Sequence, residues 1–204
     1  RRVPPIEGKL KLRRYQDETV QLVAKTFLEG AVSKAMVVMA TGLGKTVVAA
    51  ESLRRILASR KVRTLVLAHT NELVYQLERA FWPFLAADQD TLVLNGLERP
   101  TRDRLDRADL VFACVDSVFY QLSMEGGFPE YDLLVIDECH HAGAAMYSRI
   151  ILETRAGTAT VPFLLGLTAT PWRSDVHELD KVFGEPLVTV DMLTGLRNGF
   201  LAQL

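Results

Sequence analysis

Two spacings of hydrophobic residues alternate along this chain. Continuous apolar runs rich in Val, Leu and Ile recur at residues 35–40, 63–68, 91–94, 110–115, 132–136, 163–167 and 187–190. Such runs are typical of strands that are buried on both faces of a sheet. The pattern therefore predicts seven strands that lie in the interior rather than at a solvated surface.

Helical spacing occupies the stretches between these runs. Residues 15–28 end before Gly30, a suitable helix C-cap, and residues 46–58 follow a glycine-containing turn. Residues 71–81 stop before Pro83, and residues 144–154 place apolar side chains at helical intervals. Arginine and aspartate alternate over residues 99–109, as on a solvated helix face, and residues 123–129 favour a loop. Alternating strands and helices predict a three-layer α/β/α domain with a mostly parallel sheet.

Composition narrows the class of protein. The chain has 204 residues, 49% of them hydrophobic, which fits one large globular domain, and no apolar run approaches the ~20 residues of a membrane span. It begins at Arg1 without a signal-like segment, so we expect residues 1–204 to be one domain excised from a longer protein. The formal net charge of −1 predicts that any nucleic-acid contact is local. Cys114 and Cys139 suggest reduced thiols and a cytoplasmic location.

The segment Thr41-Gly42-Leu43-Gly44-Lys45-Thr46 follows the first apolar run and suits a phosphate cradle. The glycines let backbone N–H groups point inward, and the following helix start favours anions. Lys45 would reach the β- and γ-phosphates of ATP, and the Thr46 hydroxyl would bind Mg²⁺. The strict phosphate-loop pattern requires glycine where this chain has Met39, so a turn without a ligand stays open as the alternative.

Two adjacent carboxylates, Asp137 and Glu138, end another apolar run. Asp137 could hold Mg²⁺ while Glu138 orients and deprotonates the attacking water, although a pair of helix-capping carboxylates is the simpler alternative. The neighbouring Cys139, His140 and His141 invite a zinc interpretation, but consecutive residues cannot easily surround one tetrahedral ion. We expect His140 to hydrogen-bond to another motif, and the role of His141 stays open.

These segments resemble the first RecA-like lobe of superfamily 2 helicases and translocases, over nearly the whole chain. Residues 12–16 resemble the glutamine motif of that family, residues 40–46 its motif I, and residues 67–73 with Gln76 its motif Ia. Residues 135–141 resemble motif II in a DEAH-like form, and residues 166–171 resemble motif III.

The resemblance implies further roles for individual residues. Arg14 and Gln16 would bind the nucleotide beside the loop residues Thr41, Gly42, Leu43 and Gly44. Thr70, Asn71 and Ser117 would contact the nucleic-acid backbone, whereas capping is the simpler role for the first two. His140, Thr168, Ala169 and Thr170 would couple the ATP site to the nucleic-acid track.

Departures from the DEAD-box pattern at residues 69–73 and 168–173 make the chain look more like restriction-enzyme translocases and DNA-repair helicases. DNA is therefore the favoured partner, with RNA open, and no membrane partner is expected. The resemblance implies an ATP- and Mg²⁺-dependent, nucleic-acid-stimulated ATPase that needs a second RecA-like lobe in cis. A small-molecule kinase with a phosphate loop and a non-catalytic scaffold stay open as alternatives.

Overall fold

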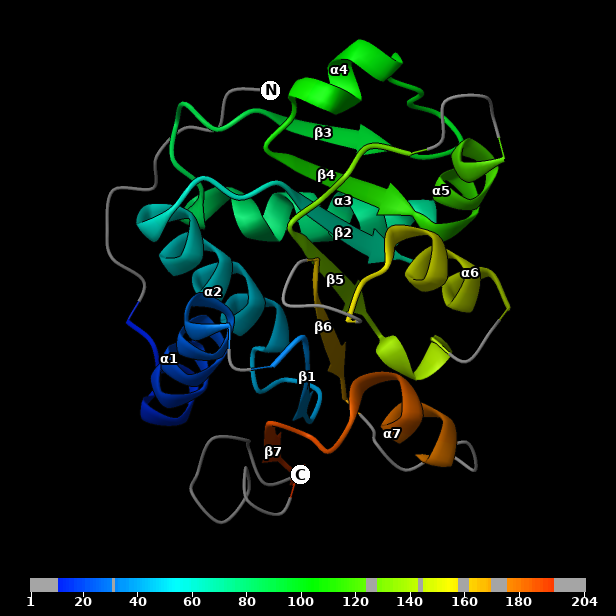
Figure 1. The fold of residues 1–204 in the computed structure, drawn as a ribbon. Coiled ribbons are helices and arrows are strands. Elements are labelled where there is room, and N and C mark those ends of the chain that lie inside the picture. The colour runs from blue at the N-terminus through cyan, green and yellow to red at the C-terminus, as the bar shows by residue number, and fades with distance from the viewer. Residues whose placement is uncertain are drawn as a thin grey trace.

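The computed structural model describes residues 11–30, 32–123, 128–142, 145–157, 162–169 and 176–192. Within these residues, helices and strands alternate along the chain (Figure 1). The helices are α1 (Arg14–Glu29), α2 (Lys45–Ser59), α3 (Asn71–Phe81), α4 (Arg102–Arg107), α5 (Val115–Leu122), α6 (Ala145–Thr154) and α7 (Val176–Phe183), with the short 3₁₀ helices η1 (Trp82–Phe84) and η2 (Cys139–His141).

Seven strands in the described residues form one sheet with the order β3-β4-β2-β5-β6-β1-β7. They are β1 (Lys34–Met39), β2 (Thr64–Ala68), β3 (Thr91–Leu94), β4 (Leu110–Cys114), β5 (Leu133–Asp137), β6 (Phe163–Thr168) and β7 (Val188–Val190). Every pairing is parallel; Val66 of β2, for example, lies between Phe112 of β4 and Val135 of β5. The predicted RecA-like α/β class with a mostly parallel sheet is confirmed.

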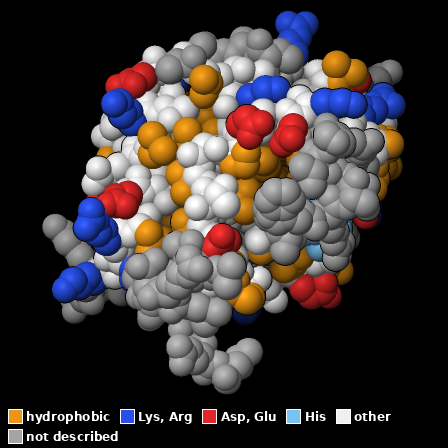
Figure 2. All heavy atoms as spheres, turned by 90° about the horizontal axis from the view of Figure 1, so that it is seen from below, with side chains coloured by type: hydrophobic (Ala, Val, Ile, Leu, Met, Phe, Trp, Pro, Cys, Tyr) orange, Lys and Arg blue, Asp and Glu red, His pale blue; other side chains and the backbone are white. Residues whose placement is uncertain are grey.

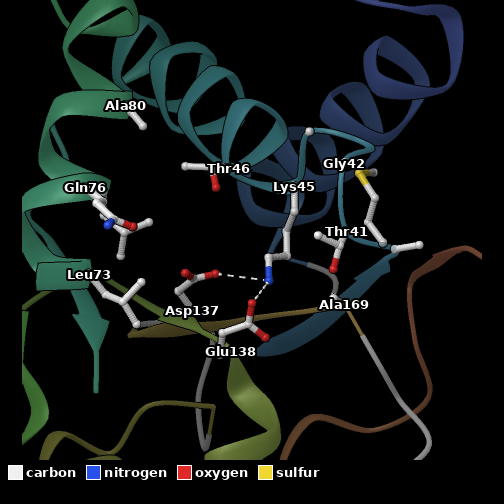
Figure 3. A pocket seen from close by; sticks show the side chains of 14 residues that line it. Thr41, Gly42, Lys45, Thr46, Leu73, Gln76, Ala80, Asp137, Glu138 and Ala169 are labelled. Atoms are coloured by element: carbon white, nitrogen blue, oxygen red, sulfur yellow. Dashed lines mark hydrogen bonds and ion pairs between the residues drawn. The ribbon is translucent and has the colours of Figure 1, made fainter. Parts of the chain in front are cut away.

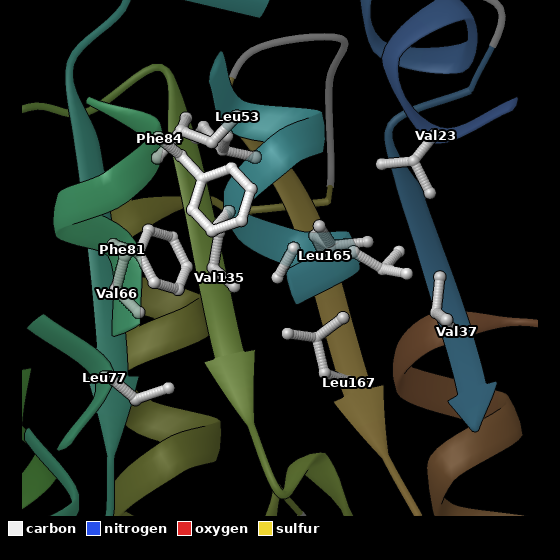
Figure 4. Close-up of a cluster of buried hydrophobic side chains, with 14 of the residues drawn as sticks. Val23, Val37, Leu53, Val66, Leu77, Phe81, Phe84, Val135, Leu165 and Leu167 are labelled. Carbon is white, nitrogen blue, oxygen red and sulfur yellow. The ribbon is translucent and has the colours of Figure 1, made fainter. Parts of the chain in front are cut away.

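Helices cover both faces of the sheet, which explains why its strands are apolar throughout. Side chains such as Val37, Val66 and Val135 pack with α1, α2 and α3 in one cluster (Figure 4). Their strand neighbours Met36 and Leu65 point to the other face and pack with α5, α6 and α7. The strand period of two thus divides each apolar run between two cores.

Most predicted boundaries agree with the structure to within one or two residues. Helix α1 ends at Glu29 and is followed by Gly30, whose φ of 62° is the left-handed C-cap conformation, and α3 spans the predicted residues 71–81. The alternating charges near residue 104 belong to the short helix α4. Part of the predicted loop, residues 124–127, lies outside the described residues.

Two features of the predicted strands need correction. The strand expected to reach Val115 ends at Cys114, because Val115 already begins α5, and Ser117 lies in the first turn of that helix. The strand expected to end at residue 167 extends to Thr168, which is the last residue of β6 and is fully buried. Thr168 thus lies at the carboxyl end of a strand, and Ser117 lies just beyond one.

Parallel pairing brings the candidate motifs to one edge of the sheet. The segment after β1, the acid pair at the end of β5 and Thr168 at the end of β6 all meet there, since β6 lies between β1 and β5. Among the described helices, none combines the length and the apolar character that crossing a bilayer requires.

Candidate nucleotide and magnesium site

The loop between β1 and α2 depends on its glycines. Gly42 and Gly44 have φ values of 84° and 86°, a region that other residues rarely adopt. A Cβ on Gly44 would also overlap with the Gln16 amide nitrogen. Helix α2 begins at Lys45, one residue before the predicted start. The loop therefore places Lys45 and Thr46 in the first turn of a helix of 15 residues, where N–H groups and the helix dipole favour an anion.

Lys45 meets the acid pair at the end of β5. Its ammonium donates a hydrogen bond to Glu138 Oε1 and lies 3.5 Å from Asp137 Oδ1 (Figure 3). The Lys45 side chain is 12% exposed and that of Asp137 is 9% exposed, so this charge cluster is largely shielded from water. One cation between two carboxylates partly compensates the cost of burying three charges.

Glu138 adopts a left-handed backbone conformation with a φ of 50°. Such conformations cost a non-glycine residue about 1–3 kcal/mol and are concentrated at functional sites. The turn directs the Glu138 carboxylate toward Lys45, whereas Asp137 stays within the strand (Figure 3). The strand end thereby gives two adjacent carboxylates different positions.

Burial raises the pKa of Asp137, and the neighbouring charge of Glu138 raises it further, while Lys45 opposes both effects. Apart from its ion pair with Lys45 at 3.5 Å, Asp137 Oδ1 has no hydrogen-bond partner within the part of the chain that the structure describes. A shielded carboxylate oxygen of this kind is suited to a cation or to water bound by one. The structure therefore fits the predicted metal role of Asp137.

His140 connects the acid pair to the end of β6. Its Nδ1 lies 3.2 Å from Glu138 Oε2 and 3.3 Å from Thr168 Oγ1. The expectation that His140 bonds to another motif is confirmed by this contact with Thr168. The orientation of one imidazole ring is thus tied to both the acid pair and the neighbouring strand.

A cavity of about 510 Å³ lies in front of these groups. The phosphate-loop segment and the acid pair form two of its walls, and Ala169 contributes from the end of β6. Helix α3 forms a further wall that sequence reasoning did not assign to the nucleotide site (Figure 3). That wall consists of Leu73, Gln76, Leu77 and Ala80.

Gln16 lies behind the phosphate loop rather than in this cavity. It is buried, its Nε2 donates to the Leu43 carbonyl at 2.9 Å, and its Oε1 accepts from the Arg13 N–H. Tyr15 donates a second hydrogen bond to the same carbonyl at 2.8 Å. Arg14 instead points to solvent, where it pairs with Glu18. The structure thus makes Gln16 a support of the loop and does not bring Arg14 to the site.

The three predicted nucleic-acid contacts occupy the same sheet edge but lie outside the cavity. Thr70 caps α3 by accepting from the Leu73 N–H at 3.3 Å, and Asn71 accepts from the Gly96 N–H. Ser117 is half-buried in the first turn of α5. The capping role of Thr70 is confirmed, whereas nucleic-acid binding stays a prediction. Thr170 lies outside the described residues.

The residues at the site suit Mg²⁺ better than zinc. The described residues contain no group of three or more His, Cys, Asp or Glu side chains arranged for one ion. Burial raises the pKa of the Cys139 thiol, which disfavours the thiolate that zinc requires. Mg²⁺ commonly needs only one or two protein oxygens beside phosphates and water, a set that Thr46 and Asp137 can provide.

Comparison with known proteins supports this assignment of the fold. The family described as "Type III restriction enzyme, res subunit" matches residues 9–173, and the chain belongs to this family. It is a first RecA-like lobe of the superfamily 2 helicases and translocases.

Two curated relatives cover most of the chain. A protein from Sulfurisphaera tokodaii named "DNA 3'-5' translocase XPB2" is 31% identical over 98% of this chain and 40% of its own length. A "Type I restriction enzyme EcoAI endonuclease subunit" from Escherichia coli is 32% identical over 93% of this chain and 23% of its own length. The chain thus spans less than half the length of these relatives.

Solved structures show the same fold. The helicase domain of Hef from Pyrococcus furiosus has a TM-score of 0.72 at 25% identity, and the match covers 87% of this chain and 37% of that one. A fragment of a putative HsdR subunit of a type I restriction enzyme from Vibrio vulnificus has a TM-score of 0.67 at 28% identity, with 93% of this chain and 32% of that one covered.

Proposed function

We propose that this chain is the ATP-binding and ATP-hydrolysing lobe of a DNA translocase or helicase. The single observation that carries the proposal is the contact of Lys45, from the loop after β1, with Asp137 and Glu138 at the end of β5. These groups border one cavity, so a polyphosphate held by the loop would face the acid pair. The relatives named as a DNA translocase and a restriction-enzyme subunit support DNA as the track.

The Lys45 ammonium would bind the terminal phosphates of ATP. A triphosphate in the cavity would compete with the two carboxylates for this cation. Once Lys45 binds the phosphates instead, Glu138 would be available to accept a proton from water. Glu138 would orient that water, and the backbone N–H groups around Gly44 would hold the phosphate oxygens. The cavity wall on α3 would limit the positions that the phosphates and their water can take.

Thr46 and Asp137 would hold Mg²⁺ beside the phosphates. When bound, this ion neutralises charge that develops on the phosphate oxygens during transfer. Asp137, the more shielded carboxylate, would bind the ion, and Glu138, held by His140, would act on water. This division of roles follows from the different exposure of the two side chains.

Contacts with the nucleic acid would be local. Lys, Arg, Asp and Glu side chains are interspersed with hydrophobic ones among the described residues of the face in Figure 2, in keeping with the net charge of −1. Thr70, Asn71 and Ser117, at the carboxyl edge of the sheet, would contact backbone phosphates. Because such contacts carry little sequence information, the motor would read sequence poorly.

A second RecA-like lobe would complete the catalytic site. Arginine fingers of such lobes are worth about 10³–10⁵ in rate. The 204 residues alone should therefore bind Mg²⁺–ATP weakly and hydrolyse it slowly, without unwinding nucleic acid.

The test is ATP turnover by the full-length protein that carries this chain, with and without duplex DNA, single-stranded DNA and RNA. We expect stimulation, greatest with DNA, and loss of turnover in Lys45→Ala. Greater stimulation by RNA than by DNA would show that RNA is the track. Turnover that no nucleic acid stimulates would refute the motor, and a phosphorylated small-molecule acceptor would identify a kinase instead. If Lys45→Ala left the ATP turnover of the full-length protein unchanged, hydrolysis would occur at another site and this lobe would be a scaffold.

A further inference from the structure

Three histidine rings from two separate segments lie beside the acid pair, and the middle ring contacts each of the other two. The ring centroids of His69 and His141 are 4.7 Å apart, and those of His141 and His140 are 4.1 Å apart. The rings are tilted by 44° and 42°. His141 is therefore the middle member of a histidine row that consists of His69, His141 and His140.

One end of the histidine row belongs to the turn between β2 and α3. His69 immediately precedes Thr70, whose hydroxyl caps α3, and the His69 carbonyl accepts a weak hydrogen bond from the Cys114 thiol of β4. The turn is thus anchored on two sides while the His69 ring stays exposed. A ligand that displaced or fixed this turn would act directly on the contact between His69 and His141.

The other end belongs to the catalytic side of the sheet edge. His140 Nδ1 lies within 3.3 Å of both Glu138 Oε2 and Thr168 Oγ1, so a rotation of its ring would alter both contacts. His141 and His140 lie in the same 3₁₀ helix, and the His141 ring packs against that of His140. Packing on one side of a ring restricts its rotamers, which selects among discrete orientations of His140.

We propose that His141 is a positioning residue that transmits nucleic-acid contact at the Thr70 turn to Glu138 through its packing against His69 and His140. The inference rests on the proposed function and adds to it the physical connection between the two sites. Binding to the Thr70 turn would fix His69, His69 would hold His141, and His141 would favour the His140 orientation that supports Glu138. The coupling between the nucleic-acid contact and Glu138 is then the difference in free energy between two packing arrangements of the histidine row.

The test compares His141→Ala, His141→Phe and His69→Ala in the full-length protein. The measured quantity is the ratio of ATP turnover at saturating DNA to turnover without DNA, together with KM for ATP and basal kcat. Site coupling is typically worth 5- to 150-fold, so we expect the ratio to fall at least about fivefold in His141→Ala. Basal kcat and KM should stay within about twofold. His141→Phe keeps an aromatic ring and should recover most of the ratio.

Each outcome decides between distinct conclusions. An unchanged ratio in His141→Ala, a His141→Phe variant as impaired as the alanine variant, or an equal fall of basal and stimulated turnover would overturn the inference. His69→Ala removes an exposed ring, so it tests the same coupling if His141→Ala does not fold, and an unchanged ratio there would also overturn it. Leu152→Ala, at a side chain that is 74% exposed on α6, is the control and should leave the ratio unaltered. Failure of the wild-type protein to respond to any nucleic acid would instead refute the proposed function.

Discussion

Gly44 and Gly184 share a left-handed backbone but differ in their surroundings, which makes them a matched pair. Gly44 has a φ of 86° and Gly184 a φ of 77°. Among the residues that the structure describes, a Cβ on Gly184 would meet no atom within 4 Å, whereas a Cβ on Gly44 would overlap with the Gln16 amide. Replacing each by alanine therefore separates backbone strain from the loss of support beneath the phosphate loop.

The expected magnitudes follow from these contacts. A left-handed backbone costs alanine roughly 1–2 kcal/mol, and the lower entropy of the unfolded chain offsets about 0.4–1 kcal/mol of that. Gly184→Ala should therefore destabilise the fold by about 1 kcal/mol. Gly44→Ala must also displace Gln16 from the Leu43 carbonyl, a hydrogen bond worth about 1 kcal/mol, which brings its cost to about 2 kcal/mol.

Thermal unfolding and nucleotide binding measure the two effects. At roughly 2–4 °C per kcal/mol for a domain of this size, Gly44→Ala should lower Tm by about 4–8 °C and Gly184→Ala by about half as much. Only Gly44→Ala should weaken binding of an ATP analogue. In a Gln16→Ala background the Gly44→Ala cost should shrink to that of strain alone. Equal losses for both glycines, with no dependence on Gln16, would refute the reasoning.

Three further variants test the site and its surroundings. Lys45→Ala removes a charge-assisted contact with the phosphates and should weaken binding of Mg²⁺–ATP about 10- to 100-fold, as measured by calorimetry. The control Lys25→Ala removes an exposed ion pair with Glu29 and should leave this binding unchanged. Asp137→Asn should be more stable than the wild type near pH 7 without metal, because burial raises the pKa of this carboxyl in the folded chain above its ordinary value of 3.8. In the wild type, loss of this proton costs the folded chain stability as pH rises from 3.8, the pKa in the unfolded chain, to the higher pKa in the folded chain. The stability advantage of the variant in denaturant titrations should therefore vanish toward about pH 4. An advantage that stays constant with pH would contradict this cause. Gly166→Ala would place a Cβ 2.6 Å from the Phe183 ring and 2.9 Å from Cys139 Sγ, and should destabilise the fold by about 1–3 kcal/mol in the same titrations, with partial recovery on adding Phe183→Leu.

The strands and the longer helices were predictable because local signals and tertiary packing agree. Apolar runs with both faces buried marked every strand, and Gly30 and Pro83 marked the ends of α1 and α3. Helix α5 escaped prediction because it begins at Val115 without a linker, so its apolar start reads as a continuation of β4. Helix α7 was also not predicted, although the sequence carries helix-end signals there: Asp175 and Glu178 have the spacing of a helix start, and Gly184 directly follows Phe183.

The composition of the site was only partly accessible from the sequence. The residue spacing within the phosphate loop and the acid pair indicates their chemistry directly from the sequence. The cavity wall on α3, in contrast, arises only from packing of that helix beside α2. The position of Gln16 under Leu43 and the contact of His69 with His141 likewise join residues that are 27 and 72 positions apart. No local pattern encodes such contacts, because the strand order determines them.

A crystal structure of the chain with Mg²⁺ and a non-hydrolysable ATP analogue tests the central claim most directly. The account predicts the γ-phosphate in the cavity between the Gly44 amide and Glu138, with Lys45 on the phosphate and the metal near Thr46 and Asp137. A nucleotide bound elsewhere, with Lys45 still paired to Glu138, would contradict it.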